Sequence, residues 1–394
     1  MSRSLRSLLG RGVVAGLALL GLSAPLSAQS LLSSRGLGYP IQPLSARAAA
    51  LGGVALGFPE PELSLVNPAS VAGLPAPALL AAFQFDRHST DVGSQDVGSG
   101  GTARFPLIHA AYPVNPRLTL SVGYGSLLDQ SWEVDHQETQ ITGADTLVLH
   151  DRFTSDGGLG RFRFGGAYGF GERFAVGAGL DVYTGNTRLA FSRSFEGEFT
   201  PAQRTQQWQY SGVGFAAGAR FAPSEAFSLA AAANVGGRLH AEPVDSLGAE
   251  RSYSLPLTLS AGGSARIGQN TLVAASAQWA GWSSADGALA DVGGARDTWG
   301  AGGGVEWDAI RLRDRPIPVR LGARYQKLPF AWQTAGGSSE WTSERAITGG
   351  VGLRLAGGAA VIDASLERGS RSSEASTFQE SFWRTMLTLR VLGR

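Results

Sequence analysis

The stretch VRLGARYQ, residues 319–326, alternates strictly between two kinds of side chain. Its odd-numbered positions are apolar or aromatic, whereas its even-numbered positions are arginine, glycine or glutamine. Because successive side chains of a β-strand point to opposite faces, the stretch predicts a strand with one apolar face and one polar face. The same alternation recurs at residues 174–183, 360–367 and 383–392.

From residue 77 onward, about fourteen such segments follow one another. The predicted strands are 77–88, 102–113, 117–137, 146–169, 173–195, 204–221, 227–240, 251–267, 271–283, 295–308, 316–332, 341–356, 359–370 and 381–393. Short turns are expected at 114–117, 169–173, 222–226, 268–270, 308–316 and 356–358. Longer polar loops are expected at 88–101, 129–145, 196–204, 241–250, 283–294, 334–340 and 370–380. Short and long connections alternate along the sequence, which is typical of outer-membrane barrels.

Two architectures accommodate these strands, a soluble β-sandwich and a closed transmembrane β-barrel. Nothing in the architecture of a sandwich requires short and long loops to alternate. The polar face here is also rich in glycine and alanine, which suits a crowded lumen. In a barrel the apolar set must face lipid, because an arginine at the bilayer midplane costs about 2–4 kcal/mol. Tryptophans near the predicted strand ends are expected to form interfacial girdles. They are Trp208, Trp279, Trp282, Trp299, Trp307, Trp332, Trp341 and Trp383.

The N-terminus has the three parts of a cleavable signal peptide, residues 1–28. A basic region precedes the apolar run Val13–Leu22, and small residues follow at Ala24–Ala28. The apolar run is about half of the roughly 20 residues that a transmembrane helix needs. With a net charge of +1 and no cysteine, the chain shows neither a basic field for nucleic acid nor a disulfide framework. We therefore expect export to the cell outer membrane, with outer-membrane lipid as a partner.

The segment 29–76 breaks the strand pattern and is predicted to be an N-terminal hatch inside the barrel, which comprises 77–394. Residues 29–44 are expected to be irregular. Ser45 is a plausible N-cap for a short helix that glycines end at residues 52 and 53. Asn67 is a better cap, because Pro68 follows it at the first helical position and Ala69 continues the turn. Neither helix is long enough to be stable alone, so both must pack on the β-structure.

No residue pattern in the chain predicts catalysis, a metal site or a cofactor. The five histidines are scattered without ligand spacing, and no serine lies in a G-x-S-x-G elbow. The remaining candidates are inward-facing charges, which either pair across the lumen and fix the hatch or hold the carboxylate of an amphipathic ligand. We prefer the structural role. These residues are Arg161, Arg163, Asp181, Arg220, Glu306, Arg320, Arg324, Arg354, Asp363, Glu367, Arg384 and Arg390.

Taken together, the signal peptide, the stretch LSARAAALGGVAL, the motif NPASVAGL and about fourteen strands resemble the FadL-like superfamily of outer-membrane proteins. The spacing of these motifs, and the C-terminal segments IDASLERGSR and ESFWRTMLTLRV, look closest to its PorV/PorQ-type branch. The resemblance covers essentially the whole mature chain. It implies a plugged barrel of the transmembrane antiparallel class that is not an enzyme.

The resemblance implies two alternative functions. FadL members carry long-chain fatty acids or other hydrophobic compounds, so the first expectation is binding or passage of hydrophobic small molecules. PorV members serve type IX secretion, so the alternative is a scaffold that binds secretion or cargo proteins through the long loops. The motif Asn67, Pro68, Ala69 and the inward charges are the site residues that follow from either hypothesis.

Overall fold

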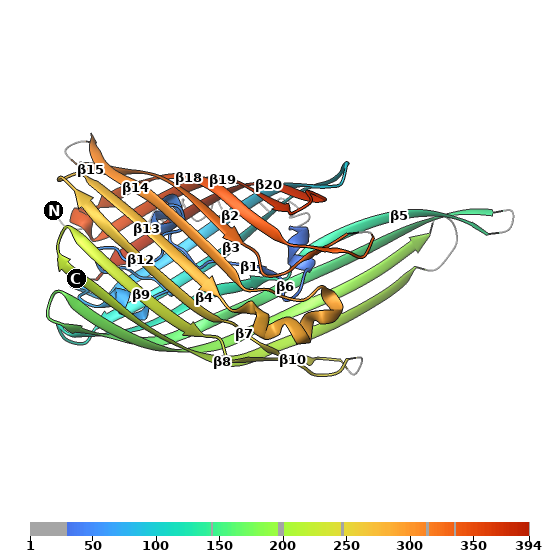
Figure 1. Cartoon of the computed structure of the whole chain (residues 1–394), viewed down its shortest axis with the longest axis horizontal. Coiled ribbons are helices and arrows are strands. Elements are labelled where there is room, and N and C mark those ends of the chain that lie inside the picture. Colours follow the sequence, from blue (N-terminus) through green and yellow to red (C-terminus); the bar gives the residue numbers. More distant parts are fainter. Residues whose placement is uncertain are drawn as a thin grey trace, which may run out of the picture.

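The computed structural model describes residues 30–142, 145–195, 201–245, 248–312, 315–334 and 336–393. The predicted signal peptide lies outside these residues. The described chain forms a closed antiparallel barrel of 14 strands that surrounds a short N-terminal segment (Figure 1). No helix in the described residues is long and apolar enough to cross a membrane.

The barrel strands follow chain order, and each pairs with its neighbour. They are β2 (Ala78–Val92), β3 (Gln95–Pro113), β4 (Leu118–Asp129), β6 (Asp145–Phe170), β7 (Phe174–Phe195), β8 (Ala202–Ser224), β9 (Phe227–Val235), β12 (Leu257–Ile267), β13 (Thr271–Ala280), β14 (Thr298–Leu312), β15 (Arg315–Lys327), β18 (Thr342–Leu355), β19 (Ala360–Ser373) and β20 (Phe378–Leu392). β2 pairs with β20 along its whole length and closes the barrel. This pairing joins the first strand to the last, because only a closed sheet or a helix can span a membrane.

The remaining elements extend or decorate the barrel. β5 (Trp132–Thr142) continues β4, β10 (Arg238–Pro243) continues β9, and β11 (Arg251–Ser254) precedes β12; β16 (Trp332–Gln333) and β17 (Ser339–Glu340) form a small hairpin. The 3-10 helices η3 (Trp282–Val292) and η4 (Ala356–Gly358) occupy two connections. β5 and the adjoining ends of β6, β7 and β8 project beyond the rest of the barrel (Figure 1).

Side-chain exposure confirms the predicted assignment of the two faces. Leu321 is 70% exposed on the outer surface, whereas its neighbour Arg320 is 4% exposed and faces the lumen. The same holds in β7, where Leu180 is outside and Asp181 is fully buried. The outer surface therefore carries an apolar band that suits a bilayer.

Two sequence expectations about the periphery are wrong. The loops expected at 88–101 and 129–145 are largely paired strands of the β2–β3 and β5–β6 hairpins, because the backbone ladder continues beyond the apolar band. The tryptophan girdle is only partial. Four of the tryptophans are exposed on the outer surface, namely Trp279, Trp299, Trp307 and Trp383. Three others are buried in apolar clusters, namely Trp208, Trp282 and Trp332; these clusters lie at the end of the barrel from which the β5–β6 hairpin projects, which we call the long-hairpin end. Position near a strand end does not specify which face a side chain occupies.

The segment 30–77 packs within the barrel, and we refer to it as the hatch. It contains η1 (Leu31–Ser34), β1 (Tyr39–Pro40), α2 (Ala46–Ala50) and η2 (Pro68–Val71). The first two elements correct the expectation that residues 29–44 are irregular. α2 contacts β15, β18, β19 and β20, and η2 contacts β6, β7 and β8. The hatch therefore touches opposite parts of the wall.

Candidate functional site

Both predicted helix caps of the hatch are present, and side chains of the barrel wall form further hydrogen bonds to the helix ends. Ser45 Oγ accepts the backbone N–H of Ala48 at the start of α2. At the other end, the Thr348 hydroxyl donates to the carbonyl of Ala50 at 2.8 Å and accepts the N–H of Gly52 at 3.1 Å. Helix ends leave backbone groups without intrahelical partners. In α2 the lumen wall supplies several of these partners.

The motif Asn67, Pro68, Ala69 lies against β7 and β8. Asn67 Oδ1 accepts the N–H of Ala69 at 2.9 Å, and its amide donates to the carbonyl of Ala219 on the wall at 3.1 Å. A Cβ on Gly218 would lie 2.1 Å from Asn67 Oδ1, and one on Gly177 would lie 2.5 Å from the backbone of Ala69. Two glycines in neighbouring strands thus make the recess that holds this turn.

A first ion-pair cluster joins α2 to the wall near the short-turn end of the barrel. Arg47 makes two hydrogen bonds to Glu306, each at 2.9 Å. Glu306 also accepts from Arg320 at 2.6 Å, and Arg320 donates to Asp363 at 2.7 Å. The charges alternate in sign along the chain of contacts, so each buried ion has an opposite neighbour.

A second cluster lines the wall towards the long-hairpin end. Arg324 contacts Glu344 and Glu367, each at 2.5 Å, and Arg384 contacts Asp86 at 2.8 Å. Arg371 bonds to Glu344 and Glu380 and completes the cluster. The hydroxyl of the hatch residue Tyr39 donates to Glu344. This cluster therefore also reaches the hatch.

A third cluster contains Arg161, Arg163 and Asp181. Arg163 makes two hydrogen bonds to Asp181, each at 2.6 Å, and Arg161 lies 3.5 Å from the same carboxylate. Both arginines also donate to the carbonyl of the hatch residue Leu65. The carboxylate of Asp181 is thus the counter-ion of both buried arginines.

The remaining predicted site residues lie elsewhere. Arg220 donates to the hatch carbonyls of Pro59 and Ala72, each at 3.2 Å. Arg354 is half-exposed at the short-turn end, 3.7 Å from Asp308. The structure distributes the predicted charges over separate clusters, and it does not bring them to one ligand site.

Sequence reasoning missed several members of these clusters. Arg47 and Tyr39 are in the hatch, and Arg104, Glu344 and Arg371 are on the wall. The signal for Arg47 was available, because it is the only charged residue in the run SARAAALGG. A lone charge within a buried small-residue helix needs a partner. Within the described residues, no group of three or more histidines and carboxylates is arranged to hold a metal ion.

The wall itself divides between β3 and β4. The two strands pair from Pro113 opposite Thr119 to Leu107 opposite Gly125, and no pairing continues beyond. Pro106 follows at this point and has no N–H to donate. Towards the long-hairpin end, the part of β3 from Gln95 to Arg104 pairs with β2 alone. We call this division the wall split.

Hatch strand β1 occupies the wall split. Tyr39 pairs with Asp129 and Pro40 with Leu128 on β4, and the N–H of Ile41 donates to the carbonyl of Leu127 at 2.9 Å. The opposite edge of β4 is already paired with β6, so β1 lies on the edge that β3 leaves. Arg104 of β3 crosses the split to Asp129 of β4 at 2.8 Å. A two-residue strand and an ion pair thus close the opening.

Comparisons with known proteins agree with this architecture. The BamG family model matches residues 12–270, more than half of the chain, and the chain therefore belongs to the BamG family. No curated protein matches the chain.

Three solved structures illustrate the fold. A FadL homologue from Pseudomonas aeruginosa has a TM-score of 0.58 at 14% identity, with 90% of this chain and 98% of that chain covered. The Pseudomonas putida toluene transporter TodX has a TM-score of 0.55 at 13% identity, with coverage of 90% and 99%. The CymD monoaromatic hydrocarbon channel has a TM-score of 0.52 at 14% identity, with coverage of 91% and 98%. At these identities the likeness shows the fold.

Proposed function

We propose that the protein is an outer-membrane channel that binds or passes hydrophobic small molecules, such as fatty acids or monoaromatic compounds. The hatch forms its gate, and the predicted signal peptide directs its export. The apolar outer band supports a place in a bilayer, and the fold is shared with proteins described as hydrocarbon channels. The observation that carries the proposal is the wall split and its closure by β1.

The wall split offers an apolar molecule a sideways route between lumen and bilayer. A closed hydrogen-bonded wall has no such route, because separating two paired strands exposes backbone groups to hydrocarbon. Here the backbone ladder is already interrupted after Leu107, and β1 with its two paired residues fills the place together with the Arg104–Asp129 ion pair. Displacement of β1 opens a slot that faces lipid directly.

A disulfide between β1 and β4 tests this gate. Ile41 and Leu127 form a hydrogen-bonded pair, so the adjacent Pro40 and Leu128 form a non-hydrogen-bonded pair, in which Cα atoms approach most closely. The natural chain has no cysteine, so the double variant P40C/L128C has no competing thiol. We expect the oxidised variant to lose uptake of radiolabelled toluene and palmitate, and reduction to restore it.

The two single-cysteine variants serve as controls, because they carry the same substitutions without the bond. Full uptake by the oxidised double variant, with disulfide formation verified by mass spectrometry, contradicts the proposed gate. A heat-dependent gel shift verifies that each variant is a folded barrel.

A second candidate function is the PorV-like scaffold role, in which the protein binds secretion or cargo proteins. The projecting sheet of β5 and the ends of β6, β7 and β8 favours it, because this sheet lies beyond the apolar band and carries charged residues such as Glu133, Asp135 and Arg152. Deletion of 132–155 should then abolish crosslinking to specific secreted proteins and leave toluene uptake unchanged. Loss of uptake without any loss of crosslinking contradicts the scaffold role.

A further inference from the structure

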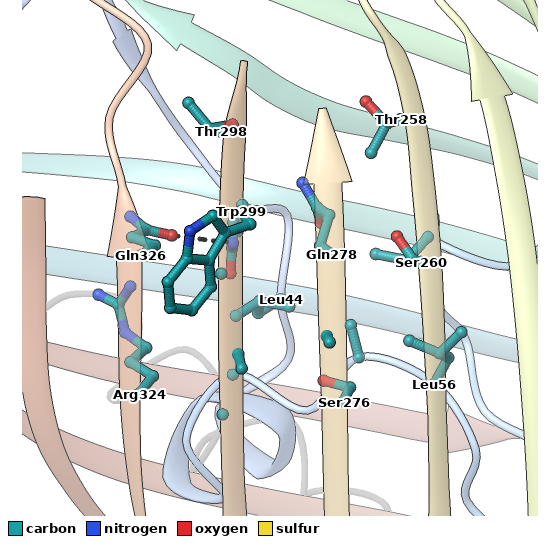
Figure 2. Close-up of a pocket in the computed structure, with 18 of the residues that line it drawn as sticks. Leu44, Leu56, Thr258, Ser260, Ser276, Gln278, Thr298, Trp299, Arg324 and Gln326 are labelled. Atoms are coloured by element: carbon teal, nitrogen blue, oxygen red, sulfur yellow. Dashed lines mark hydrogen bonds between the residues drawn. The ribbon is translucent and has the colours of Figure 1, made fainter. Parts of the chain in front are cut away.

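A cavity lies between the hatch and the inner face of β12, β13, β14 and β15 (Figure 2). Its volume is about 150 Å³, and a second space of about 120 Å³ shares much of its lining and extends towards the long-hairpin end. An engineered protein cavity of about 150 Å³ accommodates benzene, so this cavity has room for a molecule of about six heavy atoms.

The two sides of the cavity differ in chemistry. The hatch side is mainly apolar and presents Leu44, Leu56 and Val66, with Gln42 as its polar side chain. The wall side is polar, because Ser260 on β12 stands directly opposite Gln278 on β13, which stands opposite Gly300 on β14. Figure 2 shows Ser260 and Gln278 side by side on neighbouring strands. Glycine in this row leaves space that a side chain would otherwise occupy.

Two buried polar atoms on the cavity lining lack hydrogen-bond partners among the described residues. They are Nε of Arg161, whose residue is 8% exposed, and Oγ of Ser260, whose residue is 5% exposed. Buried polar atoms in proteins are nearly always paired, and an orphaned atom costs about 1–3 kcal/mol. Both residues line the 150 Å³ cavity, so a molecule within it lies beside both side chains.

The charge beside the cavity is unbalanced. Arg161 and Arg163 share the single carboxylate of Asp181, which leaves one positive charge in excess within this cluster. Both carboxylate oxygens of Asp181 accept hydrogen bonds from Arg163, whose guanidinium also donates to Asn234 at 2.6 Å. No aspartate or glutamate lines either space. A buried excess cation is costly unless an anion accompanies it.

We propose that this cavity binds a small hydroxylated carboxylate. Its carboxylate lies beside the guanidinium of Arg161 and balances the excess charge. Its hydroxyl groups contact Ser260 and Gln278, and its carbon skeleton lies against Leu44 and Leu56 of the hatch. A hydrocarbon of the same size leaves the excess positive charge unbalanced, and a long acyl chain exceeds the volume. The proposal goes beyond passage of hydrophobic molecules through the wall split.

Isothermal titration calorimetry of the full-length protein in detergent, with glycerate as the probe, tests the proposal. Glycerate carries a carboxylate, two hydroxyls and three carbons. We expect saturable binding that R161M weakens at least tenfold and S260A weakens severalfold. The control R173M changes an exposed turn outside the cavity and should bind like the natural chain.

A second variant, S260L, and a second probe, octanoate, test the proposal further. If R161M fails the heat-dependent gel shift, S260L replaces it, because the larger side chain fills the cavity and should abolish glycerate binding. Absence of saturable binding at millimolar glycerate overturns the proposal, as does equal affinity in a folded S260L or R161M protein. Octanoate binding more tightly than glycerate at the same residues overturns the assignment to hydroxylated acids. Toluene uptake is measured separately, so failure of one proposal leaves the other standing.

Discussion

The substitution Gly322→Ala is expected to loosen the hatch and leave the barrel intact. Gly322 is on the inner face of β15, where α2 ends. A Cβ at this position would lie 2.4 Å from the nitrogen of Gly52 and 2.5 Å from the carbonyl carbon of Leu51. Non-bonded carbon atoms normally approach to about 3.5–4.0 Å, so the hatch backbone must move by about 1 Å.

The magnitude follows from the contacts that this movement disturbs. The Gly52 N–H to Thr348 bond and the Thr348 to Ala50 bond hold the end of α2. Each is worth about 0.5–1.5 kcal/mol, and overpacking alone costs about 1–3 kcal/mol. Together these terms give a local destabilisation of about 2–6 kcal/mol, which raises the equilibrium population of the open hatch about 30- to 20,000-fold.

Hydrogen exchange measured by mass spectrometry on peptides covering residues 46–53 is the assay, because local opening governs exchange there. Gly349→Ala is the matched control, since a Cβ at that position of β18 would contact only the carbonyl of Arg320, at 3.6 Å. Exchange of 46–53 in G322A that equals the control, in a protein that retains the heat-dependent gel shift, refutes the reasoning.

Two further predictions concern the hatch. Asn67→Ala removes a helix cap and the bond to the Ala219 carbonyl, so we expect about 2–3 kcal/mol of local destabilisation, measured as faster exchange of residues 67–72. Burial raises the pKa of Glu62 to about 7, an effect that Arg47 partly offsets. Because the folded hatch favours the protonated form, its stability should fall as pH rises from about 4.5 to 7, by at most ~3 kcal/mol. E62Q should flatten the dependence of hatch stability on pH, measured by hydrogen exchange of the hatch. An equally steep dependence in E62Q contradicts the assignment of this effect to Glu62.

The barrel could be predicted because its signals are local. Alternation along 319–326 assigns each side chain to a face, and exposure of Leu321 with burial of Arg320 follows from it. Closure then requires an even number of strands in a single-chain barrel. The polar hairpins at 88–101 and 129–145 were mistaken for loops because an exposed paired strand has no apolar face to mark it.

One ion pair of the candidate site also follows from local rules. The β6–β7 turn places Phe170 opposite Phe174, and seven residues back on each side (170 − 163 and 181 − 174) bring Arg163 opposite Asp181. Register across a short hairpin is fixed by its turn. By contrast, Arg47 and Glu306 are 259 residues apart, and their contact depends on where α2 docks. No turn relates the hatch to the wall, so no local rule predicts that pair.

The contacts of the hatch also limit which part of it can act as a gate. Moving α2 separates Arg47 from the buried Glu306 and leaves Arg320 as the shared partner of two carboxylates, Glu306 and Asp363. Breaking a buried ion pair in this way costs about 3–5 kcal/mol. Moving β1 breaks its short pairing with β4, the Tyr39 hydroxyl bond to Glu344 and the Gln42 bond to Gln326. Most of these bonds join uncharged groups, at about 0.5–1.5 kcal/mol each. Opening at the wall split is therefore easier than expulsion of the whole hatch, and a gate there requires movement of only residues 39–43.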